Sequence, residues 1–376
     1  DSDSVDLETI AMMCKSIEDW CRANQTLIDE LESQQNKTEQ CAVLFKELNQ
    51  LGLLNILFDE DRLNKDFAEK GQADKIERSN MMLVAEAAYQ FARFSPSIAL
   101  MLVQQNMASY LLADAPSTWV ALPLYDAVVE WPFQLNVRHE SAKCFVTGHW
   151  KSIPLLFTAD SLLLPVCGKN KASFKLVLVD LKAAEDKKLA VHSSGQMLGL
   201  RGCDFGDLEL NNFEVLDDAV IRQGEAELNK IERLWSQAEV FMMAIRSGIY
   251  ESAYTVARDY AKARWQGGKY IIDHSLIRKM LADLYQEKCA LYESWQSIVA
   301  TLDTESALSD GQMGLALKSG ERLPWATSDG IQLLGGNGYM EDYNQARCFR
   351  DAKQCESLLG HPQARGFTIW QTELSA

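Results

Sequence analysis

Apolar side chains recur at steps of three and four residues through the first part of the chain, which is the period of an amphipathic helix. Within residues 81–113, for example, Leu83 and Ala87 lie one helical turn apart. Pro96 interrupts this segment, so we expect two helices there rather than one. Because no stretch of this first part alternates apolar and polar residues with a period of two, residues 1–117 are predicted to be a helical domain.

The pattern changes after residue 117. Short segments rich in β-branched and aromatic residues, separated by Gly, Asp and Asn, are typical of strands. Four such segments cover residues 128–137, 143–146, 161–166 and 174–179. Residues 118–222 are therefore predicted to be a small β domain, either a barrel or a sandwich.

From residue 223 the helical period returns in longer segments. Two apolar stripes follow it, one through Ile249, Ala253, Val256, Tyr260 and Ala263 and the other through Ile277, Leu281, Leu284, Leu291, Trp295 and Ile298. Long antiparallel helices followed by shorter ones predict a four-helix bundle over residues 223–376. The expected fold class is α+β, with an N-terminal helical domain, a middle β domain and a C-terminal bundle.

The charge balance excludes some classes of partner. The formal net charge of -16 argues against nucleic acid, because phosphate binding requires a basic face, and against docking on an anionic membrane. No segment reaches the roughly 18 apolar residues of a membrane span. The nine cysteines form no CxxC pair, so we expect no metal site and a reducing compartment. Residues 1–4 lack the features of a secretory signal, so a cytoplasmic location is expected.

Four motifs carry a resemblance to a known family. Residues 331–341 (IQLLGGNGYME) and 347–353 (RCFRDAK) resemble the QxxGGxGY and RxxRDA motifs of the acyl-CoA dehydrogenases. Residues 260–269 (YAKARWQGGK) are similar to the YAxxRxxxGK motif of that family, and residues 198–202 (LGLRG) resemble its GLRG loop. The order of a helical block, a β domain and a helical bundle is also the layout of the family.

The resemblance implies an oxidoreductase of fatty-acid β-oxidation, which uses FAD to dehydrogenate an acyl-CoA thioester and passes electrons to an electron-transfer flavoprotein. Its implied partner is a homologous subunit in a dimer or tetramer. In the family, an Arg and a Gln reach across the subunit interface to the neighbour's FAD. By resemblance, the residues that contact the pyrophosphate of a partner's flavin would be Arg264, Gln332, Gly335 and Gly336. Glycines admit backbone N–H donors, and Arg supplies a bidentate cation.

The family's catalytic base is a Glu that removes the α-proton of the thioester while the flavin takes the hydride. By resemblance, its usual position falls on Leu359 and its alternative position on Ala238, and neither side chain accepts a proton. We therefore predict no catalytic residue at the family positions. Glu239 and Glu356 lie close to these positions and are candidates for a relocated base, and Glu232 is a third candidate that requires a shift of six residues.

The loops that hold the flavin ring in the family also differ here. The counterparts of ALTEPxxGSD and KxWIT are residues 121–126 (ALPLYD) and 150–154 (WKSIP), in which Pro123 and Pro154 replace the hydroxyl residues. Proline offers neither a hydroxyl nor a backbone N–H, so an intact ring site is not expected. Trp150 takes the place of the family's Trp only if the register shifts by two.

Three alternatives follow from the family residues that this chain lacks and those that it retains. The chain is the non-catalytic half of a heteromeric acyl-CoA dehydrogenase and completes a partner's FAD site, so that it takes part in an enzyme although its own active site is impaired. Alternatively, it is a self-sufficient acyl-CoA dehydrogenase with a relocated carboxylate base. In the third alternative it is a non-enzymatic acyl-CoA-binding protein on the same fold.

Overall fold

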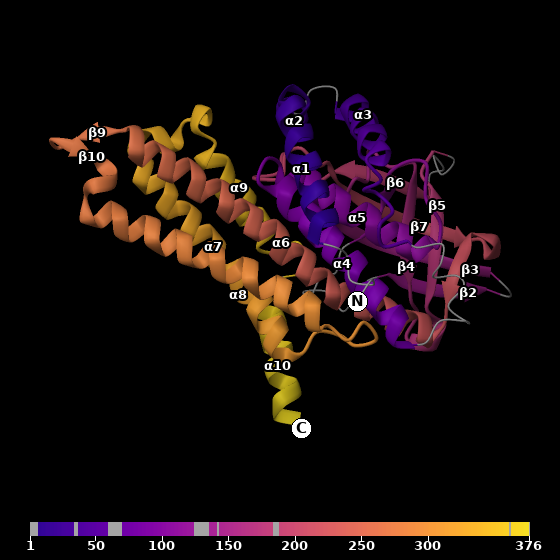
Figure 1. Ribbon diagram of the computed structural model, residues 1–376. Coiled ribbons are helices and arrows are strands. Elements are labelled where there is room, and N and C mark those ends of the chain that lie inside the picture. Colours follow the sequence, from indigo (N-terminus) through magenta and orange to yellow (C-terminus); the bar gives the residue numbers. More distant parts are fainter. Residues whose placement is uncertain are drawn as a thin grey trace.

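The computed structural model describes residues 7–33, 37–58, 70–123, 135–140, 143–182, 188–360 and 362–375. Helices occupy both ends of this chain and strands occupy its middle, and the C-terminal helices extend away from the sheets (Figure 1). This arrangement confirms the predicted α+β fold with its helical, β and helical parts. The domain boundaries at residues 117 and 222 stay predictions.

The first helical part contains α1 (Leu7–Ala23), α2 (Gln25–Ser33), α3 (Lys37–Gln50), α4 (Lys70–Ala92) and α5 (Pro96–Leu112). The break at Pro96 lies where the sequence predicts it, because proline fits the first turn of a helix but not its interior. Ser95 caps α5 by accepting a hydrogen bond from the backbone N–H of Ile98. Almost all of α5 is buried, since it packs against α4, against the bundle and against the first strand.

The strands form two separate four-stranded sheets, with no closed barrel among the residues described. One sheet has the order β1 (Val120–Ala121), β4 (Ser161–Val166), β5 (Lys175–Asp180) and β8 (Val220–Gln223). The other has the order β2 (Asn136–Glu140), β3 (Lys143–Pro154), β7 (Phe205–Val215) and β6 (Leu189–Ser193). The pair of β1 and β4 is parallel and the other pairs are antiparallel.

Two predicted strands coincide closely with β4 and β5. The strand predicted at residues 143–146 corresponds to β3, which is much longer than predicted. β3 continues to Pro154 because β7 pairs with it along its length, despite irregularities in register after Val146 and Trp150. Most of the strand predicted at 128–137 lies outside the described residues.

The C-terminal part is a bundle of long helices. Its elements are α6 (Glu225–Ala263), the short strands β9 (Trp265–Gln266) and β10 (Lys269–Tyr270), α7 (Ser275–Thr301), α8 (Asp310–Leu334), α9 (Gln345–Cys355) and α10 (Pro362–Ser375). The central helix is α6, which contacts α4, α7, α8 and α9. β9 and β10 lie at the end of the bundle farthest from the sheets, and α10 projects from its side (Figure 1).

A separate apolar cluster closes the far end of the bundle. Its buried members are Ala257, Ala261, Ile271, Leu281, Leu284, Leu333 and Leu334. The cluster joins the last turns of α6 and α8, so residues that follow these two helices are held close to one another. In the described part of the chain, no helix is long and apolar enough to cross a membrane.

Candidate functional site

The four residues predicted to contact a flavin pyrophosphate lie at this far end of the bundle: Arg264, Gln332, Gly335 and Gly336. Arg264 caps the C-terminus of α6, and the other three lie at the end of α8 and in the 3-10 turn Gly335–Tyr339. A hydrogen bond of 3.1 Å from Asn337 Nδ2 to Tyr260 Oη joins the turn to α6. The structure therefore brings the four residues to one region, and their role stays a prediction.

All four of these residues are exposed. The guanidinium group of Arg264 makes no hydrogen bond or ion pair with any other described residue. Gly335 has a φ of 60°, which glycine adopts readily at the end of a helix. At Gly336, which is outside the left-handed region, an added Cβ would meet nothing within 4 Å. Packing within the described chain therefore does not require glycine at position 336, and the space above Gly336 is open to a ligand.

Both positions predicted for the base are buried in the main apolar core. Ala238 on α6 is 1% exposed, and Leu359, which follows α9, is 3% exposed. Neither side chain can accept a proton.

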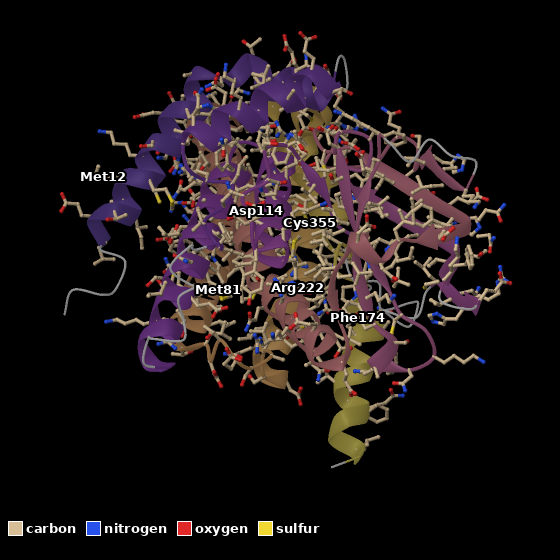
Figure 2. The ribbon with its side chains drawn as sticks, turned by 90° about the vertical axis from the view of Figure 1, so that its right-hand side faces the viewer. Met12, Met81, Asp114, Phe174, Arg222 and Cys355 are labelled. Carbon is tan, nitrogen blue, oxygen red and sulfur yellow. The ribbon has the colours of Figure 1, made fainter. Side chains whose placement is uncertain are left out.

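Glu239 is fully buried and is held by two arginines. Arg246 Nη1 lies 3.4 Å from Glu239 Oε2, and the guanidinium group of Arg365 on α10 contacts Glu239 Oε1. We call these three residues the Glu239 triad. Arg246 also donates to Ala316 O at 2.9 Å, Ser319 Oγ at 3.2 Å and Cys355 O at 3.1 Å. Cys355 lies in the interior of the molecule (Figure 2), so the triad ties α6 to α8, α9 and α10 at the centre of the fold.

The other two candidate bases are paired with lysines. Glu356 contacts Lys353 one turn earlier in the chain, and Glu232 lies 3.1 Å from Lys171 Nζ. The structure therefore holds each of the three candidate carboxylates in an ion pair with a basic side chain of this chain.

The two loops that correspond to the flavin-ring loops of the family are joined to each other by a buried side chain. Gln104 Nε2 on α5 donates to Leu122 O at 3.4 Å and to Pro154 O at 3.0 Å. Trp150 is 3% exposed and pairs with Leu208 in β7, so its ring is buried against the sheet. Residues 124–126 of the first loop lie outside the described part. Pro123 and Pro154 have neither a hydroxyl nor a backbone N–H. These two positions therefore lack the donors that would hold a flavin ring in this chain.

Comparison with known proteins agrees with the motifs and the fold. The family described as "Acyl-CoA dehydrogenase, C-terminal domain" matches residues 228–363. The chain is 28% identical over 176 residues to the mitochondrial isovaleryl-CoA dehydrogenase of Solanum tuberosum, a match that covers 46% of this chain and 42% of the relative. The chain thus spans about half the length of the curated relatives that it matches.

Solved structures share the fold along nearly the whole chain. The acyl-CoA dehydrogenase from Geobacillus kaustophilus superimposes with a TM-score of 0.80 and 13% identity, covering 100% of both chains. The butyryl-CoA dehydrogenase from Megasphaera elsdenii gives a TM-score of 0.73 at 16% identity, covering 98% of both. The matched C-terminal domain, the curated relatives and the shared fold all support the acyl-CoA dehydrogenase family. This homologue of the acyl-CoA dehydrogenases keeps their fold and has apolar side chains at both positions predicted for the base.

Two family motifs of this homologue meet inside the fold, a contact that the sequence analysis did not predict. The backbone N–H of Leu200 in the GLRG loop donates to Asp351 Oδ1 of the RxxRDA motif at 2.7 Å. Arg347 Nε lies 3.5 Å from the other oxygen of Asp351, and Arg347 Nη2 lies 3.5 Å from Glu32 Oε1. Burial, reinforced by the charge of Glu32, raises the pKa of Asp351 to about 6.

Replacing Asp351 with Asn is expected to remove a pH-dependent loss of stability. The raised pKa means that the unfolded chain releases this proton at lower pH than the folded protein does. The wild type should therefore lose stability relative to the variant as the pH rises from about 4 to about 6. Asn keeps an acceptor for the N–H of Leu200, so the comparison isolates the charge. Urea unfolding of both proteins across this interval measures the difference, and a difference that grows in favour of the wild type would contradict the assignment.

Proposed function

We propose that this chain is the non-catalytic half of a heteromeric acyl-CoA dehydrogenase and completes the FAD site of a homologous partner. The assembly would dehydrogenate an acyl-CoA thioester and pass electrons to an electron-transfer flavoprotein. One contrast carries the proposal. Arg264 is exposed without a partner among the described residues, whereas Ala238 and Leu359 fill the predicted positions of the base with buried apolar side chains.

The far end of the bundle has the chemistry that a diphosphate requires. A guanidinium group binds phosphate oxygens in a bidentate manner, and the open space above Gly336 allows the close approach of a bulky anion. Large apolar side chains are exposed beside these residues: Trp265 is 59%, Tyr339 73% and Met340 54% exposed. Clustered exposed aromatic residues are typical of protein interfaces, which supports a partner subunit at this end.

The contacts of Glu239 argue against the self-sufficient alternative. A base must be free to take a proton from the substrate, but this carboxylate lies between two guanidinium groups. Protonating it would leave two buried cations uncompensated, at a cost of several kcal/mol. Pro123 and Pro154, at the positions that correspond to the family's hydroxyl residues in these two loops, also offer no hydroxyl for a flavin ring.

The visible absorbance of the purified protein tests the proposal. The chain expressed alone should be colourless. Co-expressed with a homologue that has a Glu at the position of Leu359, it should co-purify as a yellow complex with one FAD for each catalytic subunit. Stoichiometric FAD on the isolated chain would reject the proposal.

Within such a complex, Arg264→Ala is expected to weaken FAD binding by roughly ten- to a hundredfold, the loss of one or two charge-assisted hydrogen bonds. Flavin release into the filtrate on dilution measures the affinity. Arg278→Ala is the matched control, because Arg278 lies 2.9 Å from Asp273 and so has a partner in its own chain. An equal loss of FAD affinity in both variants would point to a general electrostatic effect instead.

A further inference from the structure

A cavity of about 330 Å³ lies where α2, the GLRG loop and the start of α9 meet. Three arginines line it: Arg201 comes from the loop, and Arg347 and Arg350 come from α9. Arg201 belongs to the GLRG loop, and Arg347 and Arg350 belong to the RxxRDA motif. None of the three is among the proposed flavin contacts.

The backbone of the loop is fixed from several sides. A Cβ on Gly199 would lie 2.2 Å from Arg350 O, so only glycine allows this close approach. Gly202 N donates to Ser97 Oγ at 3.0 Å, and Lys37 Nζ donates to Arg201 O at 2.6 Å. Arg201 is therefore presented to the cavity on a rigid support, as a preformed binding residue requires.

Two of the three arginines carry a buried donor without an acceptor. The Nε atoms of Arg201 and Arg350 are buried and make no hydrogen bond to any residue in the described part of the chain. A buried N–H without an acceptor is unfavourable, so an acceptor supplied by a ligand would stabilise the site. Arg347, by contrast, donates to Phe94 O at 2.8 Å and lies 3.5 Å from Glu32.

The carboxylates that line the cavity do not neutralise the positive charge of the arginines at the inner wall of the cavity. Glu32 already accepts from Ser97 Oγ at 2.8 Å and from Arg347, while Asp29 and Glu341 are exposed. Asp29 also accepts from Gln25. The N-cap residue of α9, Asn344, lines the cavity and makes no side-chain hydrogen bond to the first turn. The partial positive charge of this helix start adds to that of the arginines.

We propose that this cavity binds a phosphate group, either free or on a small phosphate monoester. A tetrahedral dianion presents several acceptor oxygens and so can accept hydrogen bonds from the guanidinium groups of Arg201 and Arg350 together. The proposed site shares no residue with the predicted flavin contacts at Arg264, Gln332, Gly335 and Gly336.

Isothermal titration of the full chain with inorganic phosphate, and separately with AMP, tests the proposal at constant ionic strength. Saturable binding is expected, and Arg201→Gln should weaken it by roughly ten- to a hundredfold. Arg350→Gln should do the same if the first variant folds poorly, as judged by circular dichroism. Tighter binding of AMP than of phosphate would identify a monoester as the occupant, and the reverse order would identify the free ion.

Two controls separate this site from the other charges of the chain. Arg138→Gln removes an exposed arginine of β2 and should leave the affinity unchanged. Arg278→Gln removes an exposed arginine of α7 that belongs to neither proposed site, and it should also leave the affinity unchanged. No saturable binding to the wild type, or equal binding by Arg201→Gln, would overturn the proposal.

Discussion

Replacing Arg246 with Ala is expected to lower the free energy of unfolding by about 3 to 5 kcal/mol, the usual cost of breaking a buried ion pair from one side. The change removes one cation from the buried carboxylate of Glu239 and deprives three further acceptors on α8 and α9 of their donor. Without this charge, Glu239 keeps only Arg365 as an ionic partner among its described contacts.

Equilibrium unfolding in urea, followed by circular dichroism, measures the loss. The control is Lys279→Ala on α7, whose ion pair with Asp283 is exposed to solvent and should contribute little to the stability. Glu239→Gln should also destabilise the protein, because it leaves Arg246 and Arg365 without their counterion. A relocated base at Glu239 predicts the opposite outcome, in which this variant loses turnover and keeps its full stability.

Replacing Gly248 with Ala is expected to destabilise the protein by about 3 kcal/mol through overpacking. A Cβ at this position on α6 would lie 2.5 Å from Ala92 Cβ and 2.6 Å from Tyr89 O on α4. Two of the three nearest atoms belong to the backbone of α4, so a change of rotamer cannot relieve the clash and the helices must separate.

Gly314→Ala is the matched control for this substitution, since Gly314 also lies inside a long helix. A Cβ there would meet nothing within 4 Å, so the variant should gain up to about 1 kcal/mol from the higher helix propensity of Ala. Thermal unfolding of both variants measures the contrast. Similar effects of the two substitutions would show that α4 and α6 do not pack as closely as the geometry requires.

Much of the fold can be predicted from the sequence because its signals are local. The period of apolar residues marks the long helices, and Pro96 marks the break between α4 and α5. The extent of β3 is less predictable. Ser152 has a φ of 54° and the register with β7 shifts nearby, yet pairing with β7 carries the strand on to Pro154. Contacts with a distant strand outweigh the local break.

The candidate site residues can be proposed from the sequence alone: the glycines and Arg264 as contacts of a flavin, and Leu359 and Ala238 as apolar residues at the positions predicted for a base. Contiguous motifs carry this information, so no contact map is needed to obtain it. The partners of the other polar groups come from the three-dimensional structure. Glu239 is held by Arg365, which is 126 positions away in the chain, and the GLRG loop rests on Asp351, which is 151 positions from Leu200. Such pairs depend on how whole helices pack, and no local pattern of residues encodes that packing.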